Sequence, residues 1–417
     1  MHPAQAISGT SSNSLAGRTI LLGVCGSIAA VETVKLAREL IRHGAEVIAV
    51  MTGAAQQIVT ADALHYATGV RPIVALSGDV EHVRLCGEQH EADLLLIAPA
   101  TANTIAKVAL GIDDSPVTTC AATAIGSGMP VLIAPAMHAP MERHPRIQEH
   151  LQALRTLGVG LIEPTHGEGI AKLASIETIV AHVQRTLGDR TLFGRSVLVI
   201  SGPTAQPVDD MRLLTNRSTG ATGRALAAEA WLRGARVQLW CGSRHVPLPD
   251  HLQSDVQRFG TIDELLALVE AMPRVDVVLM PAAVADYSPT PVRGKIPSGS
   301  ATLALTLRRT PKVIDRIRKA HRGVLVGFKA TSGAKEAGLR TAAGTLAERA
   351  RLDLVVANDL GEVDDDHHRV LLLDDEGSLE VHGSKAAVAS AILSRVCVHL
   401  ARAKGRRRAP PAPRRRR

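Results

Sequence analysis

The chain has 417 residues, which corresponds to two or three domains, and hydrophobic residues make up 46% of it, so a disordered chain is excluded. Aromatic residues amount to only 2%, which argues against a protein that stacks single-stranded nucleic acid on aromatic side chains. The formal net charge is +8, but nine cationic residues and no acidic ones lie between Arg402 and Arg417. Without these nine, the chain would carry a net charge of −1, so the folded body is nearly neutral.

Both ends of the chain are predicted to be disordered. Residues 401–417 lack apolar periodicity and form either a solvated terminus or a weak attachment point for the phosphates of nucleic acid or acidic lipid. Residues 1–17 are polar and contain no apolar segment of signal-peptide length. No apolar run reaches about 18 residues. The five cysteines form no C-x-x-C pair. We therefore expect a cytoplasmic protein without a membrane span.

In the first half of the chain, apolar runs alternate with segments of helical periodicity. The runs at 19–24, 46–51, 93–98 and 130–134 are continuous, which is typical of parallel strands buried on both faces. Helical patterns occupy 27–43, 101–110 and 145–158. This alternation predicts a doubly wound α/β domain over residues 18–190.

A second cycle of the same kind begins near Gly194. Strands are predicted at 196–200, 235–240, 275–279, 323–327 and 353–357, and a helix at 219–234. The sequence therefore predicts a second doubly wound domain over residues 191–400, with a boundary at about 187–194.

Polar residues follow several predicted strands of the first half, where doubly wound sheets bind their ligands. The turn that contains Gly26 and Ser27 opens a helix, and Thr101 and Asn103 open another. The first turn is either an ordinary strand–helix connection or a phosphate-binding turn. Because its spacing is not G-x-G-x-x-G, a mononucleotide phosphate fits it better than a dinucleotide.

The segments 26–30 (GSIAA), 99–114 (PATANTIAKVALGIDD) and 135–141 (PAMHAPM) together resemble the flavin-dependent cysteine decarboxylase family. The resemblance implies a flavodoxin-like fold, bound FMN and a trimeric assembly. It implies that FMN is bound by Gly26, Ser27, Ile28, Ala29, Thr52, Pro99, Ala100, Thr101, Asn103 and Thr104.

The family's catalytic histidine corresponds to His82, in the segment His82-Val83-Arg84-Leu85; the plainer alternative is a surface histidine on a helix. Two positions depart from the family pattern. His138 stands where the family has asparagine, and the flap segment 163–173 (EPTHGEGIAKL) lacks the family's cysteine. The proton donor of the reaction is therefore His138, His166 or solvent. This shorter flap resembles that of archaeal-type members.

In the second half, an acidic and a basic residue, Asp286 and Lys295, follow a predicted strand, a combination that suits magnesium and a triphosphate. Phe328 ends another strand and either supports a planar base or belongs to the core. The ordered set GPTAQPVD (202–209), TNRSTG (215–220), AAVADY (282–287), GKI (294–296), VGFKA (326–330) and AND (357–359) resembles phosphopantothenate–cysteine ligase.

The ligase resemblance implies catalytic roles for Asn216, which would stabilise an acyl-nucleotide, and for Arg212, which would assist the substrate carboxylate. It implies Mg²⁺ at Asp286 and CTP, or ATP, as the co-substrate. The implied nucleotide-binding residues are Ala282, Asp286, Lys295, Pro311, Lys312, Val313, Ile314 and Phe328.

Together the two halves resemble the fused, bifunctional enzymes of coenzyme A biosynthesis. The resemblance implies that 4′-phosphopantothenate, L-cysteine and a nucleoside triphosphate are the substrates. It also implies a homo-oligomer built on trimers, up to a dodecamer. Two alternatives stay open: a ligase with an inactive FMN-binding first half, and a non-enzymatic flavoprotein that serves as a regulatory subunit. No membrane or nucleic-acid partner is expected.

Overall fold

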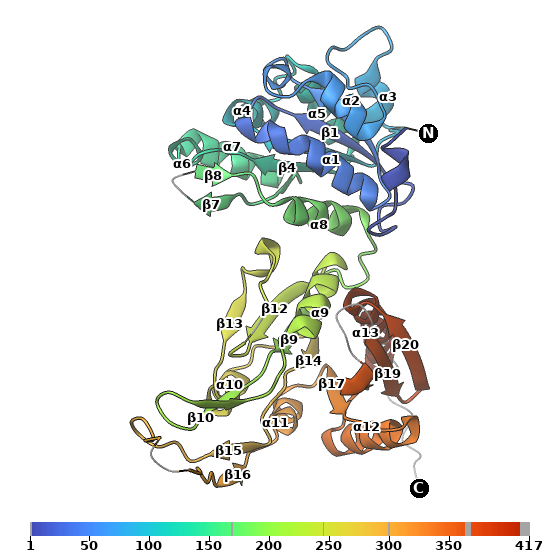
Figure 1. Cartoon of the computed structure of the whole chain (residues 1–417). Helices are drawn as coiled ribbons and strands as arrows, with labels where there is room; N and C mark the ends of the chain where they lie inside the picture. The colour runs from blue at the N-terminus through green and yellow to red at the C-terminus, as the bar shows by residue number, and fades with distance from the viewer. Residues whose placement is uncertain (1, 168–169, 245, 299–300, 363–367, 409–417) are drawn as a thin grey trace. The chain divides into compact units, whose positions relative to one another are not determined.

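The computed structural model describes residues 2–167, 170–244, 246–298, 301–362 and 368–408. They belong to two compact units, Met1–Asp189 and Arg190–Arg417 (Figure 1). Each unit is built on a sheet whose strands are mainly parallel, as predicted. Within the described ranges, no helix combines the length and the apolar character needed to cross a membrane.

The first unit contains a parallel sheet with a flavodoxin-like strand order. In spatial order its strands are β2 (Glu46–Met51), β1 (Thr19–Val24), β3 (Leu94–Ala100), β4 (Val131–Pro135) and β6 (Gly160–Leu161). The chain leaves β1 toward β2 and then crosses to β3 on the other side. The carboxyl ends of β1 and β3 therefore form the switch point at which such sheets bind ligands.

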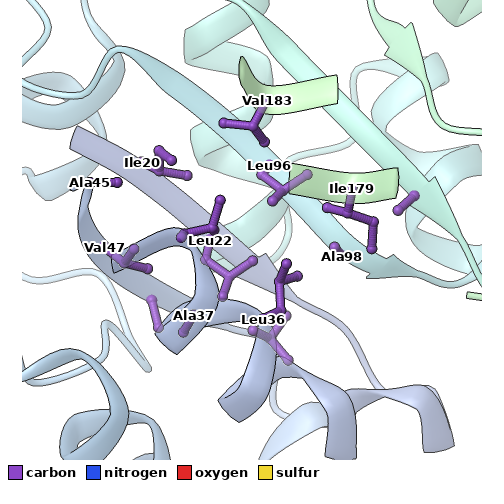
Figure 2. Packing of buried hydrophobic residues seen from close by; sticks show 14 of the residues in the cluster. Ile20, Leu22, Leu36, Ala37, Ala45, Val47, Leu96, Ala98, Ile179 and Val183 are labelled. Carbon is purple, nitrogen blue, oxygen red and sulfur yellow. The ribbon is translucent and has the colours of Figure 1, made fainter. Parts of the chain in front are cut away.

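Helices cover both faces of this sheet. They are α1 (Thr33–Arg42), α2 (Ala61–Thr68), α3 (Glu81–Cys86), α4 (Ala102–Leu110), α5 (Pro116–Ser127), α6 (Ala139–Glu142), α7 (Pro145–Thr156) and α8 (Ile176–Leu187), with 3₁₀ turns η1 (Gln5–Ile7), η2 (Ile28–Glu32) and η3 (Ala55–Gln57). Alternate residues of β1 face opposite ways, so Ile20 and Leu22 pack toward α1 and α8 (Figure 2), whereas Leu21 belongs to the core on the other face. The predicted helix 27–43 differs in its first turn, which is the 3₁₀ turn η2.

A small antiparallel sheet lies beyond β4. Its strands, in spatial order, are β5 (Met137–His138), β8 (Ile170–Lys172) and β7 (Thr165–Gly167). The flap segment 163–173 supplies two of these strands, and its residues 168–169 lie outside the described residues.

The prediction of a disordered N-terminus is wrong for residues 2–17. Leu15 is fully buried in the core beneath α1, and Ala4 joins the same cluster. The amides of Gly9, Ser11 and Leu15 donate to the carbonyls of Ile41, Arg42 and His43. Because the last carbonyls of a helix lack partners within the helix, the end of α1 offers acceptors to a segment whose composition is polar.

The second unit contains a mixed sheet. In spatial order its strands are β13 (Val256–Arg258), β12 (Arg236–Cys241), β9 (Ser196–Ser201), β14 (Val277–Met280), β17 (Val324–Thr331), β18 (Leu354–Asp359), β19 (His368–Asp374) and β20 (Gly377–Gly383). All neighbouring pairs up to β18 are parallel, and the last two strands run antiparallel. The predicted strands are present, and the β19–β20 hairpin is an addition that the sequence analysis missed.

The helices of the second unit lie on the two faces of its sheet. They are α9 (Ala221–Leu232), α10 (Ile262–Glu270), α11 (Val313–Ala320), α12 (Glu336–Ala350) and α13 (Lys385–Arg408), with 3₁₀ turns η4 (Asp250–Leu252) and η5 (Leu360–Glu362). Helices α9 and α13 share one core cluster, whereas α10 and α11 pack over the other face. Two short ribbons complete the unit: β10 (Ala205–Pro207) with β11 (Leu213–Thr215), and β15 (Tyr287–Pro289) with β16 (Leu307–Arg309).

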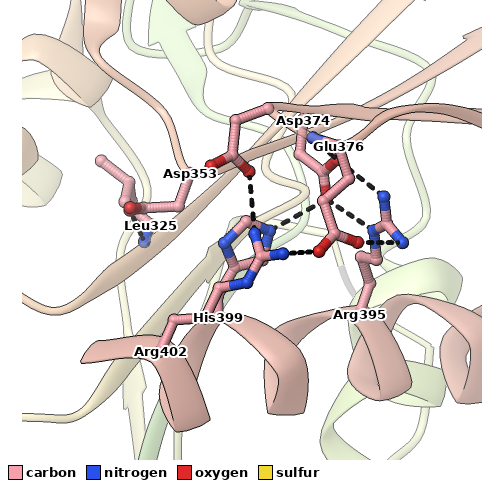
Figure 3. Close-up of polar contacts among 8 residues, drawn as sticks. Leu325, Asp353, Asp374, Glu376, Arg395, His399 and Arg402 are labelled. Atoms are coloured by element: carbon pink, nitrogen blue, oxygen red, sulfur yellow. Dashed lines mark hydrogen bonds and ion pairs between the residues drawn. The ribbon is translucent and has the colours of Figure 1, made fainter. Parts of the chain in front are cut away.

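The turn of the β19–β20 hairpin is tied to α13 by a buried carboxylate (Figure 3). The Asp374 side chain is 1% exposed and accepts hydrogen bonds from Arg395 Nε at 2.5 Å and from His399 Nε2 at 3.0 Å. Burial alone would favour the neutral acid, but the bonds from Arg395 and His399 hold the pKa of Asp374 below its usual range.

The predicted disorder of residues 401–417 is also wrong in part. Helix α13 continues to Arg408, and its apolar positions between Val388 and Leu400 pack against the sheet. Arg402 in this stretch pairs with Asp375 and Glu376 of the hairpin turn. Residues 409–417 lie outside the described residues.

Candidate functional site

Three hydroxyl side chains begin helical segments at the carboxyl edge of the first sheet. Ser27 accepts from the Ala29 amide at 3.4 Å, Thr52 from the Ala55 amide at 3.2 Å, and Thr101 from the Thr104 amide at 3.3 Å. Ser27 Oγ also lies 3.5 Å from the Ala136 carbonyl, which links the loops after β1 and β4. The switch point thus offers hydroxyls and helix N-terminal amides to a phosphate.

The loop after β1 approaches the loop after β2 so closely that only glycine fits at position 26. A Cβ on Gly26 would lie 2.5 Å from the Cβ of Ala54. At the same edge, Ile28 is 78% exposed and offers an apolar surface to a planar ring, and Asn103 is also exposed. Pro99 and Ala100, by contrast, are buried within β3 and can contribute only through their backbone. These features fit a flavin mononucleotide, which combines a phosphate with an apolar ring system.

His82 lies on α3, a separate element from these loops. Its side chain is half-buried, and its Nδ1 is buried without a hydrogen-bond partner. The helix starts directly after Val80, whose φ of 45° is rare for a β-branched residue. Among the described residues of one chain, therefore, no hydrogen bond ties His82 to the polar side chains of the predicted flavin site.

The two histidines considered as proton donors lie on the small antiparallel sheet. His138 is exposed at the end of β5, which pairs with β8, and His166 lies on β7, the other neighbour of β8. His166 Nε2 lies 3.0 Å from a carboxylate oxygen of Glu142. Cys25, at the end of β1, is fully buried, and this burial raises the pKa of its thiol to about 11 in spite of a hydrogen bond with Thr104. Cys25 is thus a neutral thiol buried beneath the carboxyl edge of the first sheet.

In the second unit, the carboxyl edge of the sheet opens into a cavity of about 1300 Å³. Its walls come from the loops after β11 and β14, from the carboxyl ends of β17 and β18, from the first turns of α9, α11 and α13, and from one face of α12. The predicted residues that line it are Asn216, Ala282, Asp286, Pro311, Lys312, Val313, Ile314 and Phe328. Segments that are more than 100 residues apart in the sequence thus meet around one volume.

Within this cavity, Asn216 is held by a hydrogen bond from its Nδ2 to the Ala283 carbonyl at 2.9 Å. Lys312 Nζ lies 2.5 Å from Asp286 Oδ1, so the predicted metal-binding carboxylate forms an ion pair. This lysine stands where the ligase pattern has an acid, and it therefore brings a positive charge to the start of α11.

Two predicted residues lie elsewhere. Arg212 does not line the cavity; it pairs with the buried carboxylate of Asp209 and donates to the Ile296 carbonyl at 3.3 Å. Amides of Ile296, Met211 and Arg212 donate to Asp209 and lower its pKa to about 2. Lys295 lines a second cavity, of about 460 Å³, beside the β15–β16 ribbon.

The structure adds cavity residues that sequence reasoning did not single out. They are cationic or polar side chains: Arg217, Lys329, Asn358, His368 and Lys385. Arg217, Lys329 and Asn358 lie in the ligase motifs quoted above, but those motifs alone gave them no role. His368 and Lys385 carry no local signal, because they reach the cavity only through the β19–β20 hairpin.

Comparison with known families assigns both units. Residues 8–188 match the family model described as "Flavoprotein", and residues 192–399 match the model "DNA/pantothenate metabolism flavoprotein C-terminal domain". Together the two models account for most of the chain.

Solved structures resemble the two units separately. The crystal structure of the FMN-dependent cysteine decarboxylase SpaF is 31% identical, covers 40% of this chain and 99% of its own, and has a TM-score of 0.36. The crystal structure of the C-terminal domain of a coenzyme A biosynthesis bifunctional protein is 27% identical, covers 51% of this chain and 100% of its own, and has a TM-score of 0.43.

Two curated relatives match along nearly the whole chain. The coenzyme A biosynthesis bifunctional protein of Thermococcus kodakarensis is 46% identical and covers 89% of this chain and 93% of its own length. That of Methanocaldococcus jannaschii is 34% identical and covers 95% and 97%. The chain therefore belongs to the family of bifunctional coenzyme A biosynthesis proteins, enzymes that pair a phosphopantothenate–cysteine ligase with an FMN-binding phosphopantothenoylcysteine decarboxylase.

Proposed function

We propose that the second unit ligates L-cysteine to 4′-phosphopantothenate at the expense of CTP, with ATP as the alternative nucleotide. The observation that carries this proposal is the cavity of about 1300 Å³, which gathers Asn216, Lys312 and Phe328 around one volume. Its volume exceeds the roughly 300–1,000 Å³ of a site for one small ligand, as a site for two substrates requires.

In the proposed reaction, a carboxylate oxygen of phosphopantothenate attacks the α-phosphorus of the nucleotide, and pyrophosphate leaves. The amine of cysteine then attacks the acyl carbon, the nucleoside monophosphate leaves, and the nitrogen loses a proton to give the amide. Lys312 and the first turn of α11 hold the phosphates by charge and backbone amides. Asn216, fixed by its bond to Ala283, orients the acyl-nucleotide.

Mg²⁺ is part of this proposal. It is usually held by one or two carboxylates together with substrate phosphates, and Asp286 supplies one carboxylate at the cavity wall. Lys312 already neutralises this carboxylate in part, so we place the ion between Asp286 and the incoming phosphates. Arg212 acts from behind the wall, where Asp209 fixes its guanidinium.

For the first unit we propose decarboxylation of 4′-phosphopantothenoylcysteine. When bound, FMN supplies reversible oxidation of the substrate's thiol carbon, which makes the loss of CO₂ easy. The hydroxyls of Ser27 and Thr101 hold the phosphate end of the cofactor at the switch point. The imidazole of His82 orients the substrate carboxylate and moves a proton. Protonation of the product carbon falls to His138, His166 or solvent.

We further propose that the protein acts as a cytoplasmic homo-oligomer built on trimers. Exposed apolar side chains flank the proposed sites of the first unit: Val80 is 50% and Val83 is 52% exposed beside His82, and Val31 is 51% exposed beyond Ile28. Contacts between copies through these surfaces would bring His82 of one copy to the flavin edge of another. Light scattering of the purified protein measures this assembly directly.

Two assays test the proposal against its alternatives. Incubation with phosphopantothenate, cysteine and either nucleotide should release pyrophosphate, faster with CTP than with ATP. Incubation with synthetic 4′-phosphopantothenoylcysteine and FMN should release CO₂. If pyrophosphate is released but CO₂ is not, the protein is a ligase whose flavin-binding half is inactive. If neither product is released, the protein is a non-enzymatic flavoprotein.

A further inference from the structure

His82, the proposed proton-transfer residue of the first unit, lies in the first turn of α3, a helix of only six residues. Its Nδ1 is buried and has no hydrogen-bond partner among the described residues, so no bond of that nitrogen fixes the ring. The place of the imidazole is therefore set by the backbone of α3. An isolated helix this short is unstable in water, so contacts outside α3 must hold it.

The C-terminal end of α3, away from His82, is held by the core. Leu85 and Cys86 are fully buried, and α3 packs against α5. Ser127, at the end of α5, donates from its hydroxyl to the Cys86 carbonyl at 2.6 Å. The Ala92 amide donates to the Leu85 carbonyl at 3.2 Å. These contacts fix one end of the helix.

The N-terminal end of α3, which carries His82, follows an irregular segment. Ile73 still pairs with Val50 of β2 in a parallel bridge, but residues 74–80 belong to no helix or strand. Val80, the N-cap residue, has φ 45° and ψ 48°, and its side chain makes no capping hydrogen bond. Because this left-handed conformation is unfavourable for a β-branched residue, neighbouring contacts must maintain it.

Ser77 and Glu81 supply these contacts, and we call this pair the Ser77–Glu81 clamp. The Ser77 amide donates to one carboxylate oxygen of Glu81 at 3.0 Å, and the Ser77 hydroxyl donates to the other at 2.7 Å. Ser77 Oγ accepts from the Asp79 amide at 3.1 Å, and the Val80 amide donates to the Ser77 carbonyl at 3.3 Å. Val80 therefore lies within a short loop whose two ends are bonded to each other.

The charge state of Glu81 keeps the clamp in place near neutral pH. Hydrogen bonds from the Ser77 amide and then the Ser77 hydroxyl lower the pKa of Glu81 to about 2. Because these bonds stabilise the charged form, the carboxylate is ionised throughout the neutral range. The clamp is therefore a fixed part of the structure and not a pH switch.

We propose that Glu81 is a positioning residue of the decarboxylase: held by Ser77, it fixes the left-handed turn at Val80 and so sets the place of the His82 imidazole. This inference rests on the decarboxylase function, and on the role of His82, proposed above. Glu81 itself takes no part in the reaction. Without the clamp, α3 is anchored only at its C-terminal end, and the imidazole spends less time in its productive position.

The test measures CO₂ release per bound FMN in the full-length protein. We expect Glu81→Ala to lower kcat by about 10- to 100-fold, as misplacement of a catalytic group by about 1 Å implies. Glu81→Gln should restore most of the lost kcat, because its amide oxygen can accept from the Ser77 amide and its NH₂ group can donate to the Ser77 hydroxyl. Glu88→Ala, at an exposed carboxylate after the end of α3, is the matched control and should leave kcat unchanged.

A double-mutant cycle with His82→Asn separates positioning from stability. If Glu81 acts only through His82, Glu81→Ala should have no further effect on the residual CO₂ release once His82 is replaced by asparagine. Ser77→Ala keeps the bond from the Ser77 amide, so it should lower kcat less than Glu81→Ala does. The melting temperature and FMN content of each variant show that the first unit is folded and loaded.

The outcomes separate the clamp from the function on which it rests. If Glu81→Ala lowers kcat by the same factor with and without the His82 imidazole, Glu81 does not act through His82 and the inference is overturned. It is also overturned if Glu81→Ala leaves kcat unchanged, or if Glu81→Gln is as slow as Glu81→Ala, while His82→Asn still lowers kcat. If the unmodified protein releases no CO₂, or His82→Asn leaves its release unchanged, the proposed decarboxylase mechanism fails and the inference fails with it.

Discussion

The two units use the same kind of sheet edge in different ways. In the second unit, two loops, the ends of two strands, the first turns of three helices and one face of α12 line one cavity of about 1300 Å³, and a single chain supplies these residues. In the first unit, the switch-point loops gather Ser27, Thr52 and Thr101, but His82 lies on α3 and makes no hydrogen bond to them within the described residues. The proposed ligase site is thus assembled within a chain, whereas the proposed decarboxylase residues are brought together only in part.

This difference follows from what each half must hold. In the proposed ligation, two substrates and a labile acyl-nucleotide would need a volume that limits the access of water. A flavin mononucleotide is gripped at one end by helix N-termini, and its ring can be covered by another surface. The exposed Ile28 and Val83 of the first unit, which are 78% and 52% exposed, are available for such a cover.

The largest effect that separates the two sites should come from His82→Asn. Asparagine can form hydrogen bonds but cannot transfer a proton, so CO₂ release from phosphopantothenoylcysteine should fall by about 10²- to 10⁴-fold. Pyrophosphate release by the ligase should be unchanged. His90→Asn, at an exposed histidine that bonds the Ala92 carbonyl, is the control. Equal loss of both activities in a folded variant would show that the two sites are not independent.

The reciprocal change is Asn216→Asp. It removes the hydrogen bond to Ala283 and places a negative charge beside a carboxylate and phosphates, so pyrophosphate release should fall by about 10²- to 10³-fold. Decarboxylation of added phosphopantothenoylcysteine by the same preparation serves as the internal control. An unchanged ligation rate would remove Asn216 from the proposed mechanism.

A smaller effect is expected from Gly26→Ala at the flavin edge. The added methyl group would meet the Cβ of Ala54 at 2.5 Å, so the loops must move apart. We expect the free energy of unfolding of the first unit to fall by about 1–3 kcal/mol and FMN to be retained less well, as measured by thermal melting and flavin absorbance. Gly53→Ala, where an added Cβ has no neighbour within 4 Å, should leave both unchanged.

The smallest effect concerns Asp359, the last residue of β18, next to Asn358 in the cavity wall. Amides of Ala334, Gly361 and Gly333 and the Thr331 hydroxyl donate to Asp359 and lower its pKa to about 2. Because this pKa is lower than that of the unfolded chain, about 3.9, Asp359 stabilises the fold fully above about pH 4, and the contribution is lost as pH falls toward 2.

Asp359→Asn should therefore flatten the fall in melting temperature of the second unit between pH 4 and pH 2. Asp263→Asn, at an exposed position in the first turn of α10, should leave the profile unchanged. An unaltered profile for Asp359→Asn would mean that these hydrogen bonds do not stabilise the loop.

The strands, and the polar residues at the carboxyl edges of the sheets, could be predicted from the sequence because each is marked by a pattern within a few neighbouring residues. Continuous apolar runs define β1 and β2 to the residue, and caps such as Thr101 stand directly at the helix starts. The β19–β20 hairpin escaped because β20 (GSLEVHG) is mostly exposed and carries no continuous apolar run that would mark it as a strand. Lys295 is close to Asp286 in the sequence, which led to the prediction of a shared site. In the structure, Lys295 lines a different cavity, beside the β15–β16 ribbon.

The central claim, two separate sites on one chain, is tested most directly by mass spectrometry of the products from phosphopantothenate, cysteine and CTP, with the flavin-free protein and after FMN is restored. The account predicts phosphopantothenoylcysteine without FMN and phosphopantetheine with it. Phosphopantetheine formed without any flavin, or a ligation step that requires FMN, would contradict it.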